Sequence, residues 1–145
     1  MRDSLGGTVT LVIVVVFIVI TLGYMAFNVN YTKAFRMKNK VISVYEKYEG
    51  ECNSSCENEI KEYAAKLGYN PIESYGCPSG YSLGTSKYYC YKEVTSKGSE
   101  LEGYGTVTRY YSIVTKINVN IPIINNIFDL RMFQITGDTK TFEVE

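Results

Sequence analysis

Histidine and tryptophan are absent from this 145-residue chain, which holds only three prolines and four cysteines. The lack of histidine removes the side chain that most often serves as a general base or metal ligand near neutral pH. Fifteen basic residues balance fifteen acidic ones at a pI near 6.3, so no general attraction to nucleic acid is expected. Phosphate-binding glycine loops and nucleophile elbows are also missing. We therefore expect no enzymatic activity, no cofactor and no nucleic-acid partner.

Charge is missing altogether between Leu5 and Thr32, and Val9–Ile20 within that stretch is almost unbroken hydrocarbon. A helix rises about 1.5 Å per residue, so roughly 20 apolar residues cross the ~30 Å core of a bilayer. We expect a transmembrane helix over residues 8–32, with residues 1–7 as a short leader or cytoplasmic tail. The charged region before the apolar run is very short and no small-x-small site follows Val29, which favours a retained anchor over a cleaved signal.

Two cues for the orientation in the membrane conflict. A basic cluster follows the apolar run, and positive charge tends to stay on the cytoplasmic side. Four cysteines in a small domain instead suit an oxidising compartment, and we give them more weight. The expectation is a single-pass membrane protein with an extracytoplasmic head, at the cell surface or in a pilus. The basic cluster itself is either a site for anionic lipid headgroups or a solvated helix face; it comprises Lys33, Arg36, Lys38, Lys40 and Lys47.

The helix is expected to continue beyond the membrane as an amphipathic segment over residues 33–50. Apolar residues recur there at steps of three and four, which is the spacing of one helix face. Gly50 supplies a stop signal, so a single helix from Thr8 to Tyr48 is predicted. The apolar positions are Ala34, Met37, Val41, Val44, Tyr45 and Tyr48.

Residues 51–145 are expected to form an α+β head. A short helix is predicted from Cys56 to Leu67, capped by Ser54 or Ser55 and ended by Gly68. The pattern then changes to alternation of apolar and polar residues, which is typical of half-buried antiparallel strands. We predict three to five antiparallel strands with one face covered by the amphipathic helix. The predicted strands are 87–94, 107–123, 128–132 and 141–144, with turns at 125–126 and 137–138.

Acidic residues and cysteines offer the remaining candidate chemistry. The carboxylate pairs Glu57/Glu59 and Glu100/Glu102 lie in polar surroundings and are expected to be solvated surface. The cysteine spacing departs from the C-x2-C zinc knuckle, so two disulfides are preferred to a zinc site. A pairing of the third cysteine with the fourth would close a hairpin-sized loop and leave the first with the second, while the other pairings stay open. The four cysteines are Cys52, Cys56, Cys77 and Cys90.

Several segments together resemble the TadE-like pilus proteins, a family of type IV pilin-like subunits. The resemblance lies in Gly6–Thr10, Asn30–Asn39, Ile121–Ile124 and Phe133–Thr141, and it covers about half of the chain. It implies a bacterial Tad-type pilus component with its N-terminus inside, a long helix and a small β-rich head outside. The partners it implies are the lipid bilayer and, through the helix, other copies or other pilin-like subunits.

The resemblance also implies a processing site and an assembly surface. A prepilin peptidase would cut after Gly6 or Gly7. Val12 stands where such pilins usually carry a glutamate, which suits a minor or membrane-retained component. The expected assembly face of the helix comprises Thr10, Val14, Phe17 and Thr21.

The alternative is a membrane-tethered binding module that does not polymerise; a third, weaker reading is a cytoplasmic zinc domain.

Overall fold

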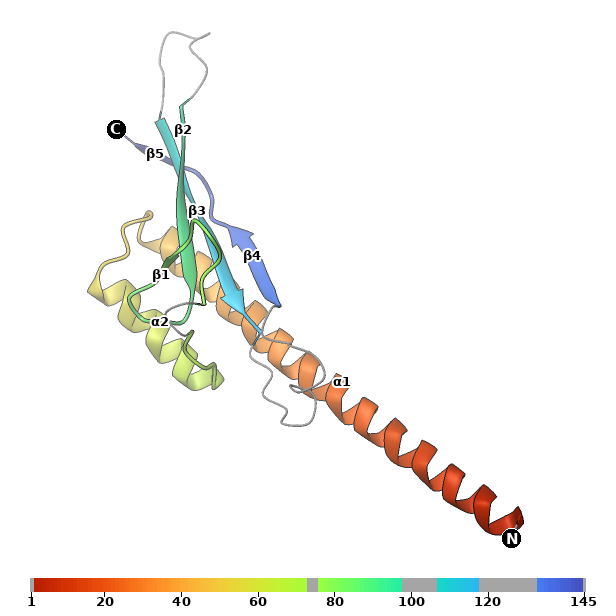
Figure 1. The fold of residues 1–145 in the computed structure, drawn as a ribbon. Coiled ribbons are helices and arrows are strands. Elements are labelled where there is room, and N and C mark those ends of the chain that lie inside the picture. Colours follow the sequence, from red (N-terminus) through yellow and green to blue (C-terminus); the bar gives the residue numbers. More distant parts are fainter. Residues whose placement is uncertain (1, 73–75, 98–106, 118–132, 145) are drawn as a thin grey trace.

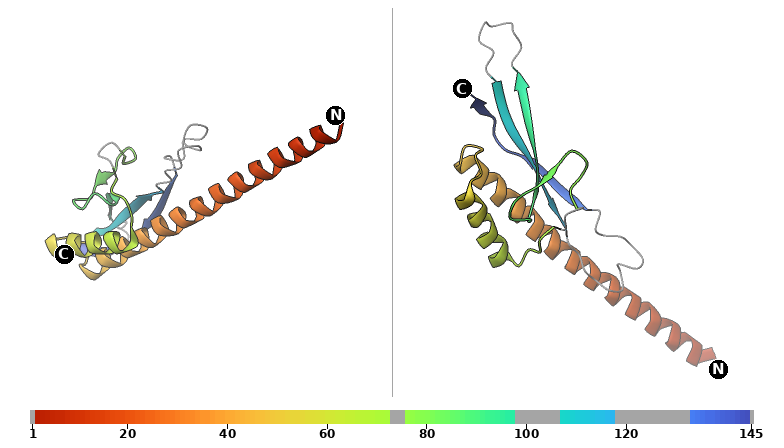
Figure 2. Two further views of the ribbon diagram at one scale, coloured as in Figure 1. Left: turned by 90° about the horizontal axis from the view of Figure 1, so that it is seen from below. Right: turned by 60° about the vertical axis from the view of Figure 1, so that its left-hand side comes forward.

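One continuous helix carries a small α+β head. The structure, a computed structural model, describes residues 2–72, 76–97, 107–117 and 133–144. Helix α1 (Arg2–Lys47) has 46 residues and is about 69 Å long at 1.5 Å per residue. Its N-terminal half projects away from the rest of the chain, and its C-terminal half lies under the sheet and beside the second helix (Figures 1 and 2). The fold is α+β, as the sequence predicts.

The C-terminal half of α1 supplies one wall of the core. Ala34, Met37, Val41 and Val44 are 0–1% exposed, which confirms the predicted amphipathic face. The helix ends at Lys47. Three residues later, Gly50 has a φ of 83° and its amide donates to the Tyr45 carbonyl at 2.8 Å. A glycine is needed there because a Cβ would lie 2.8 Å from the Tyr111 ring, in addition to the strain of a positive φ.

Helix α2 (Ser54–Leu67) runs alongside the C-terminal half of α1. Its cap is Asn53 and not the predicted Ser54 or Ser55. The Asn53 backbone is extended and its side-chain oxygen accepts from the amides of Ser55 at 3.0 Å and Cys56 at 3.1 Å. Asparagine is among the best capping residues, so the serines fall into the first turn. Gly68 ends α2 in the left-handed region with a φ of 62°, as predicted.

The sheet is antiparallel and has β3 at its centre. Strand β2 pairs with one side of β3, and β4 and β5 follow each other along the other side. Between these two short strands, the Thr139 hydroxyl accepts from the Tyr111 amide at 3.0 Å, so the ladder is not interrupted. The strands are β1 (Ser82–Leu83), β2 (Cys90–Lys97), β3 (Val107–Lys116), β4 (Gln134–Asp138) and β5 (Phe142–Val144).

Two predicted strands and one predicted turn need correction. The strand expected at 87–94 is β2, displaced to Cys90–Lys97, because Gly84 and Lys87 form a tight turn before it. The strand expected at 107–123 is β3, which ends at Lys116, and positions 118–123 of that prediction lie outside the described residues. The expected turn at Gly137–Asp138 is part of β4. A Cβ at Gly137 would meet α1 side chains at 3.0 Å, so this glycine permits close helix–sheet packing instead of a turn. The predicted strand at 128–132, the predicted turn at 125–126 and the pair Glu100/Glu102 lie outside the described residues.

Strand β3 is buried on both faces over Tyr111–Thr115, whereas alternation predicted burial of one face. Its odd-numbered side chains face α1 and α2. Its even-numbered residue Val114 packs with Ile72 and Cys90, and Cys77, Tyr81 and Leu83 pack against them. The segment between α2 and β2 therefore covers the second face of the sheet, a layer that local periodicity does not reveal.

Candidate functional site

The N-terminal half of α1 is an exposed apolar rod. From Val9 to Met25 every large apolar side chain is at least 40% exposed, so no other part of the described chain covers it. An apolar surface of this extent on a soluble monomer marks a contact with protein or lipid. Gly6–Lys47 is the one helix among the described residues that is long and apolar enough to cross a membrane. None of its apolar window is buried within the chain, unlike the core helix of a soluble protein.

Three polar side chains on or just after this rod are bonded to the backbone of the helix itself. The hydroxyls of Thr10 and Thr21 donate to the carbonyls of Gly6 and Phe17, each at 2.9 Å, and the Asn30 amide donates to a carbonyl one turn earlier at 2.9 Å. Backbone bonding of this kind lowers the cost of placing a hydroxyl in hydrocarbon. The rod therefore carries little polar penalty for insertion into lipid or between other apolar helices.

The residues expected for assembly and processing all lie on this rod. Thr10, Val14, Phe17 and Thr21 are exposed, but so are the residues around them, so exposure alone does not single out one face. Gly6 and Gly7 lie inside α1, and a Cβ at either position would contact nothing within 4 Å. Steric crowding therefore does not explain glycine at these two positions.

An aromatic ladder marks the transition from the rod to the head, and the sequence analysis missed it. Tyr31 stacks between Phe27 and Phe35 with centroid separations of 6.4 Å on each side, and Phe133 meets Phe27 edge-on at 5.7 Å. The Lys38 ammonium lies 4.6 Å from the Phe35 ring centroid. The signal available in the sequence was the spacing of four residues between the aromatics, which places them on one helix face.

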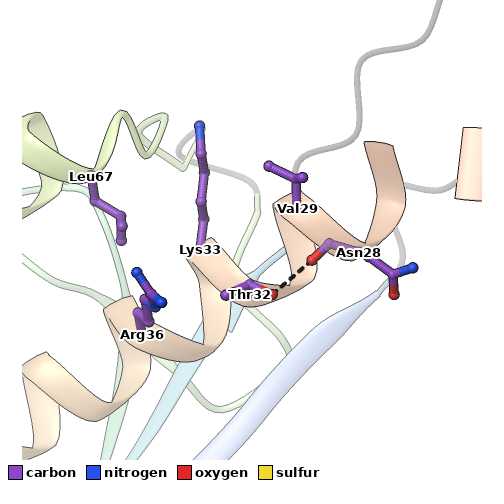
Figure 3. A pocket seen from close by; sticks show the side chains of 6 residues that line it. All are labelled: Asn28, Val29, Thr32, Lys33, Arg36 and Leu67. Atoms are coloured by element: carbon purple, nitrogen blue, oxygen red, sulfur yellow. Dashed lines mark hydrogen bonds between the residues drawn. The ribbon is translucent and has the colours of Figure 1, made fainter. Parts of the chain in front are cut away.

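On another side of α1 at the same level, an open groove of about 360 Å³ lies along α1 and is bordered by Leu67 at the end of α2 (Figure 3). Lys33 and Arg36 extend on the α2 side, and Arg36 is directed toward Leu67. The half-buried Lys33 donates to the Gly68 carbonyl at 3.2 Å. The lining residues are Asn28, Val29, Thr32, Lys33, Arg36 and Leu67.

Inside the head, a buried hydrogen-bonded chain joins both helices to the sheet layer. The Tyr45 and Tyr89 hydroxyls are 2.9 Å apart, and Tyr89 donates to a Glu57 carboxylate oxygen at 2.7 Å. The other Glu57 oxygen accepts from the Ser86 amide at 3.0 Å. Burial raises the pKa of both tyrosines above the ordinary value. Glu57 is thus a half-buried structural acceptor and not the solvated residue that the sequence suggested.

Glu59, the other member of that predicted surface pair, bridges two lysines of α1. Its carboxylate oxygens lie 2.7 Å from the Lys40 ammonium and 2.8 Å from that of Lys47. Hydrogen bonds from these lysines lower the pKa of Glu59 to about 2. Two of the basic residues after the apolar run are therefore occupied in holding α2 against α1.

All four cysteines are joined in disulfides, Cys52 with Cys56 and Cys77 with Cys90. The first bridge closes the connection between the helices, and the second ties the covering segment to the start of β2. With every sulfur in a disulfide, this arrangement offers no cysteine ligand to zinc. The described residues contain no other cluster of potential metal ligands.

No protein-family model, curated protein sequence or solved structure matches this chain. Its role therefore has to be argued from the exposed rod, the groove and the disulfide-linked head.

Proposed function

We propose that this protein is a structural, pilin-like subunit or minor component of a type IV-related, Tad-type pilus, assembling through its N-terminal helix. The observation that carries the proposal is the exposed apolar half of α1, which is continuous with a helix buried in the head. A rod of this kind has two suitable environments, the bilayer and a bundle of similar rods. The resemblance of its ends to TadE-like proteins supports the same assignment.

Energetics favour assembly only after the helix leaves the lipid. Burying apolar surface gains about 25 cal/mol per Å² relative to water. Within the bilayer this gain is small because lipid tails are as apolar as the rod, and close packing must drive association there. A filament core of parallel rods, outside the membrane, would receive the full hydrophobic contribution.

The disulfides support a head on the extracytoplasmic side. Disulfides persist in oxidising compartments and are rare in the cytosol. Lys40 and Lys47, which contribute to the opposing positive-inside cue, are engaged with Glu59. That cue therefore rests more on Lys33, Arg36 and Lys38, and the proposed topology keeps the N-terminus inside.

Two measurements on the protein made in its native cell type test the proposal. Mass spectrometry of the mature N-terminus should show cleavage after Gly6 or Gly7. Because no native cysteine is free, single cysteines added to the rod provide clean cross-linking probes. We expect cross-linked dimers from each single substitution on the assembly face, T10C, V14C, F17C and T21C. Matched controls are V12C and V19C, which lie on the opposite side at 3.6 residues per turn; equal cross-linking there would contradict the assigned face.

The tethered binding module is the second candidate, and Val12 counts against the packing of a major filament subunit. The glutamate usual at this position of pilins pairs with the N-terminal amine of a neighbouring subunit, and valine cannot form that pair. An intact start at Met1 or Arg2 together with no cross-linking at any rod position would establish this alternative and exclude assembly.

A further inference from the structure

We propose that the groove between α1 and α2 is a binding site for the phosphate group of an anionic phospholipid, with Lys33 and Arg36 as its ligands. The inference rests on membrane insertion of the rod, which is part of the proposed function, but it does not require assembly. Its ligand is a headgroup in the leaflet next to the head. Asn28 and Thr32 border the groove on its membrane side, where the Thr32 hydroxyl donates to the Asn28 carbonyl at 2.8 Å (Figure 3).

The position of the groove along α1 matches the depth of the headgroups. If the hydrocarbon begins near Gly7, roughly 20 residues at 1.5 Å each place its far boundary near Ala26 or Phe27. The groove begins at Asn28 and extends to Arg36, within the following three turns. The aromatic ladder, which starts at Phe27 on another side of the helix, lies at the same level, and aromatic residues are enriched at membrane interfaces.

The charge of the groove is positive and uncompensated. None of its six lining residues is acidic. Within the described parts of the chain, Arg36 forms no ion pair and donates no hydrogen bond, although it is directed into the groove. Among the described residues, the hydrogen-bond acceptor of the Lys33 ammonium is the neutral Gly68 carbonyl. Lys40 and Lys47 differ, since both are neutralised by Glu59.

The shape of the groove suits a headgroup and the start of its acyl chains. Guanidinium presents a planar fork of donors to phosphate oxygens, and an ammonium adds a second charge. Val29 and Leu67 provide apolar walls beside these donors. A phospholipid presents this combination of an anion next to hydrocarbon, whereas free inorganic phosphate would leave the apolar walls unused.

Titration of the full-length protein in phosphate-free maltoside micelles tests the site. Short-chain phosphatidylglycerol is added, and the amide resonances of residues 28–36 report binding. The variant K33Q/R36Q should weaken binding about 25-fold, from roughly a factor of five per basic group near an anionic lipid. The control K61Q/K92Q removes two exposed lysines outside the groove and should bind as the parent does. R36Q alone, which retains the Lys33–Gly68 hydrogen bond, should lose about fivefold and melt at the parental temperature.

Each comparison has a decisive outcome. The proposal is supported if phosphatidylglycerol binds saturably, if short-chain phosphatidylcholine binds more weakly and if inorganic phosphate does not bind. The affinity for phosphatidylglycerol must also fall in R36Q. Equal responses to inorganic phosphate and phosphatidylglycerol would overturn the lipid as ligand. Equal affinity of R36Q, K33Q/R36Q and the parent would overturn the site. Binding is measured on monomers, so a failure of rod cross-linking leaves this result unaffected.

Discussion

The tyrosine–glutamate chain in the head permits a directional prediction. Each hydroxyl has one proton to donate, and the Glu57 oxygen is the acceptor of the Tyr89 hydroxyl. Tyr89 therefore donates to Glu57 at 2.7 Å and must accept from Tyr45, whose hydroxyl is 2.9 Å away. Tyr89 is fully buried and Tyr45 is 3% exposed, so water cannot replace a lost partner easily. The two tyrosines consequently occupy unequal positions in the chain, even though both would conventionally be replaced by phenylalanine.

The expected cost of each replacement follows from what it leaves behind. Y45F removes one neutral hydrogen bond and leaves Tyr89 with its acceptor, which costs about 1 kcal/mol. Y89F removes a hydrogen bond to a charged group and strands the Tyr45 hydroxyl, for a total of about 3 kcal/mol. The double variant Y45F/Y89F contains no stranded hydroxyl and should be no less stable than Y89F. The two effects are therefore expected to be strongly non-additive.

Denaturant unfolding of the full chain in maltoside micelles measures these differences as shifts in the free energy of unfolding. Y88F is the matched control, because the half-buried neighbour Tyr88 has no hydroxyl hydrogen bond within the described structure; its shift should stay below about 0.5 kcal/mol. Equal costs for Y45F and Y89F that add in the double variant would refute the assigned direction of donation. A pH titration gives a second check: because burial raises the folded pKa of Tyr45 and Tyr89, stability present below pH 10 should decline above it.

Three other perturbations have defined outcomes. G84A places a Cβ 2.5 Å from the Tyr89 ring and should cost about 1–3 kcal/mol, seen as a lower melting temperature. Replacing Cys77 and Cys90 together by alanine should lower the free energy of unfolding by about 3 kcal/mol, and removing the other disulfide should lower it by about 2 kcal/mol. The Cys77–Cys90 disulfide closes the longer loop, with a separation of 13 residues. A larger effect of the other disulfide would contradict the loop-entropy argument. The pKa of Glu59 is lowered, so its stabilisation is present above about pH 4.5 and lost toward pH 2; E59Q should remove that dependence in acid melting curves, at a cost of about 0.2–1 kcal/mol near neutral pH.

Helix periodicity predicted the long rod and its core face because both depend on local spacing. Ala34, Met37 and Val41 could be assigned to the core from the sequence alone, and Gly68 to a helix end. The covering layer over β3 could not be assigned, because Ile72 and Val114 meet only through the tertiary fold. The alternation of apolar and polar residues along β3 predicted one buried face. Because the strand is buried on both faces, this prediction was wrong for the second face.

Thr115 shows how a polar residue on an apolar face can be misread. In the sequence it interrupts the apolar series of β3, but in the structure it is fully buried and its hydroxyl donates to the Ala34 carbonyl at 2.9 Å. The groove was similarly out of reach, because its walls combine Thr32 with Leu67 from another helix. The basic residues could be identified from the sequence. Which of them form ion pairs depends on the packing of α1 against α2.

The same contacts fix the depth at which the head sits on the rod. Thr115 attaches the sheet to α1 at Ala34. The preceding residue, Lys33, is bonded to the Gly68 carbonyl at the end of α2. The Tyr69 hydroxyl, just beyond α2, also donates to the Lys116 carbonyl at 2.6 Å. Sheet and both helices are thus joined at the level where the groove lies. A force or displacement applied to the rod, by lipid or by neighbouring rods, would act on the head through these short connections.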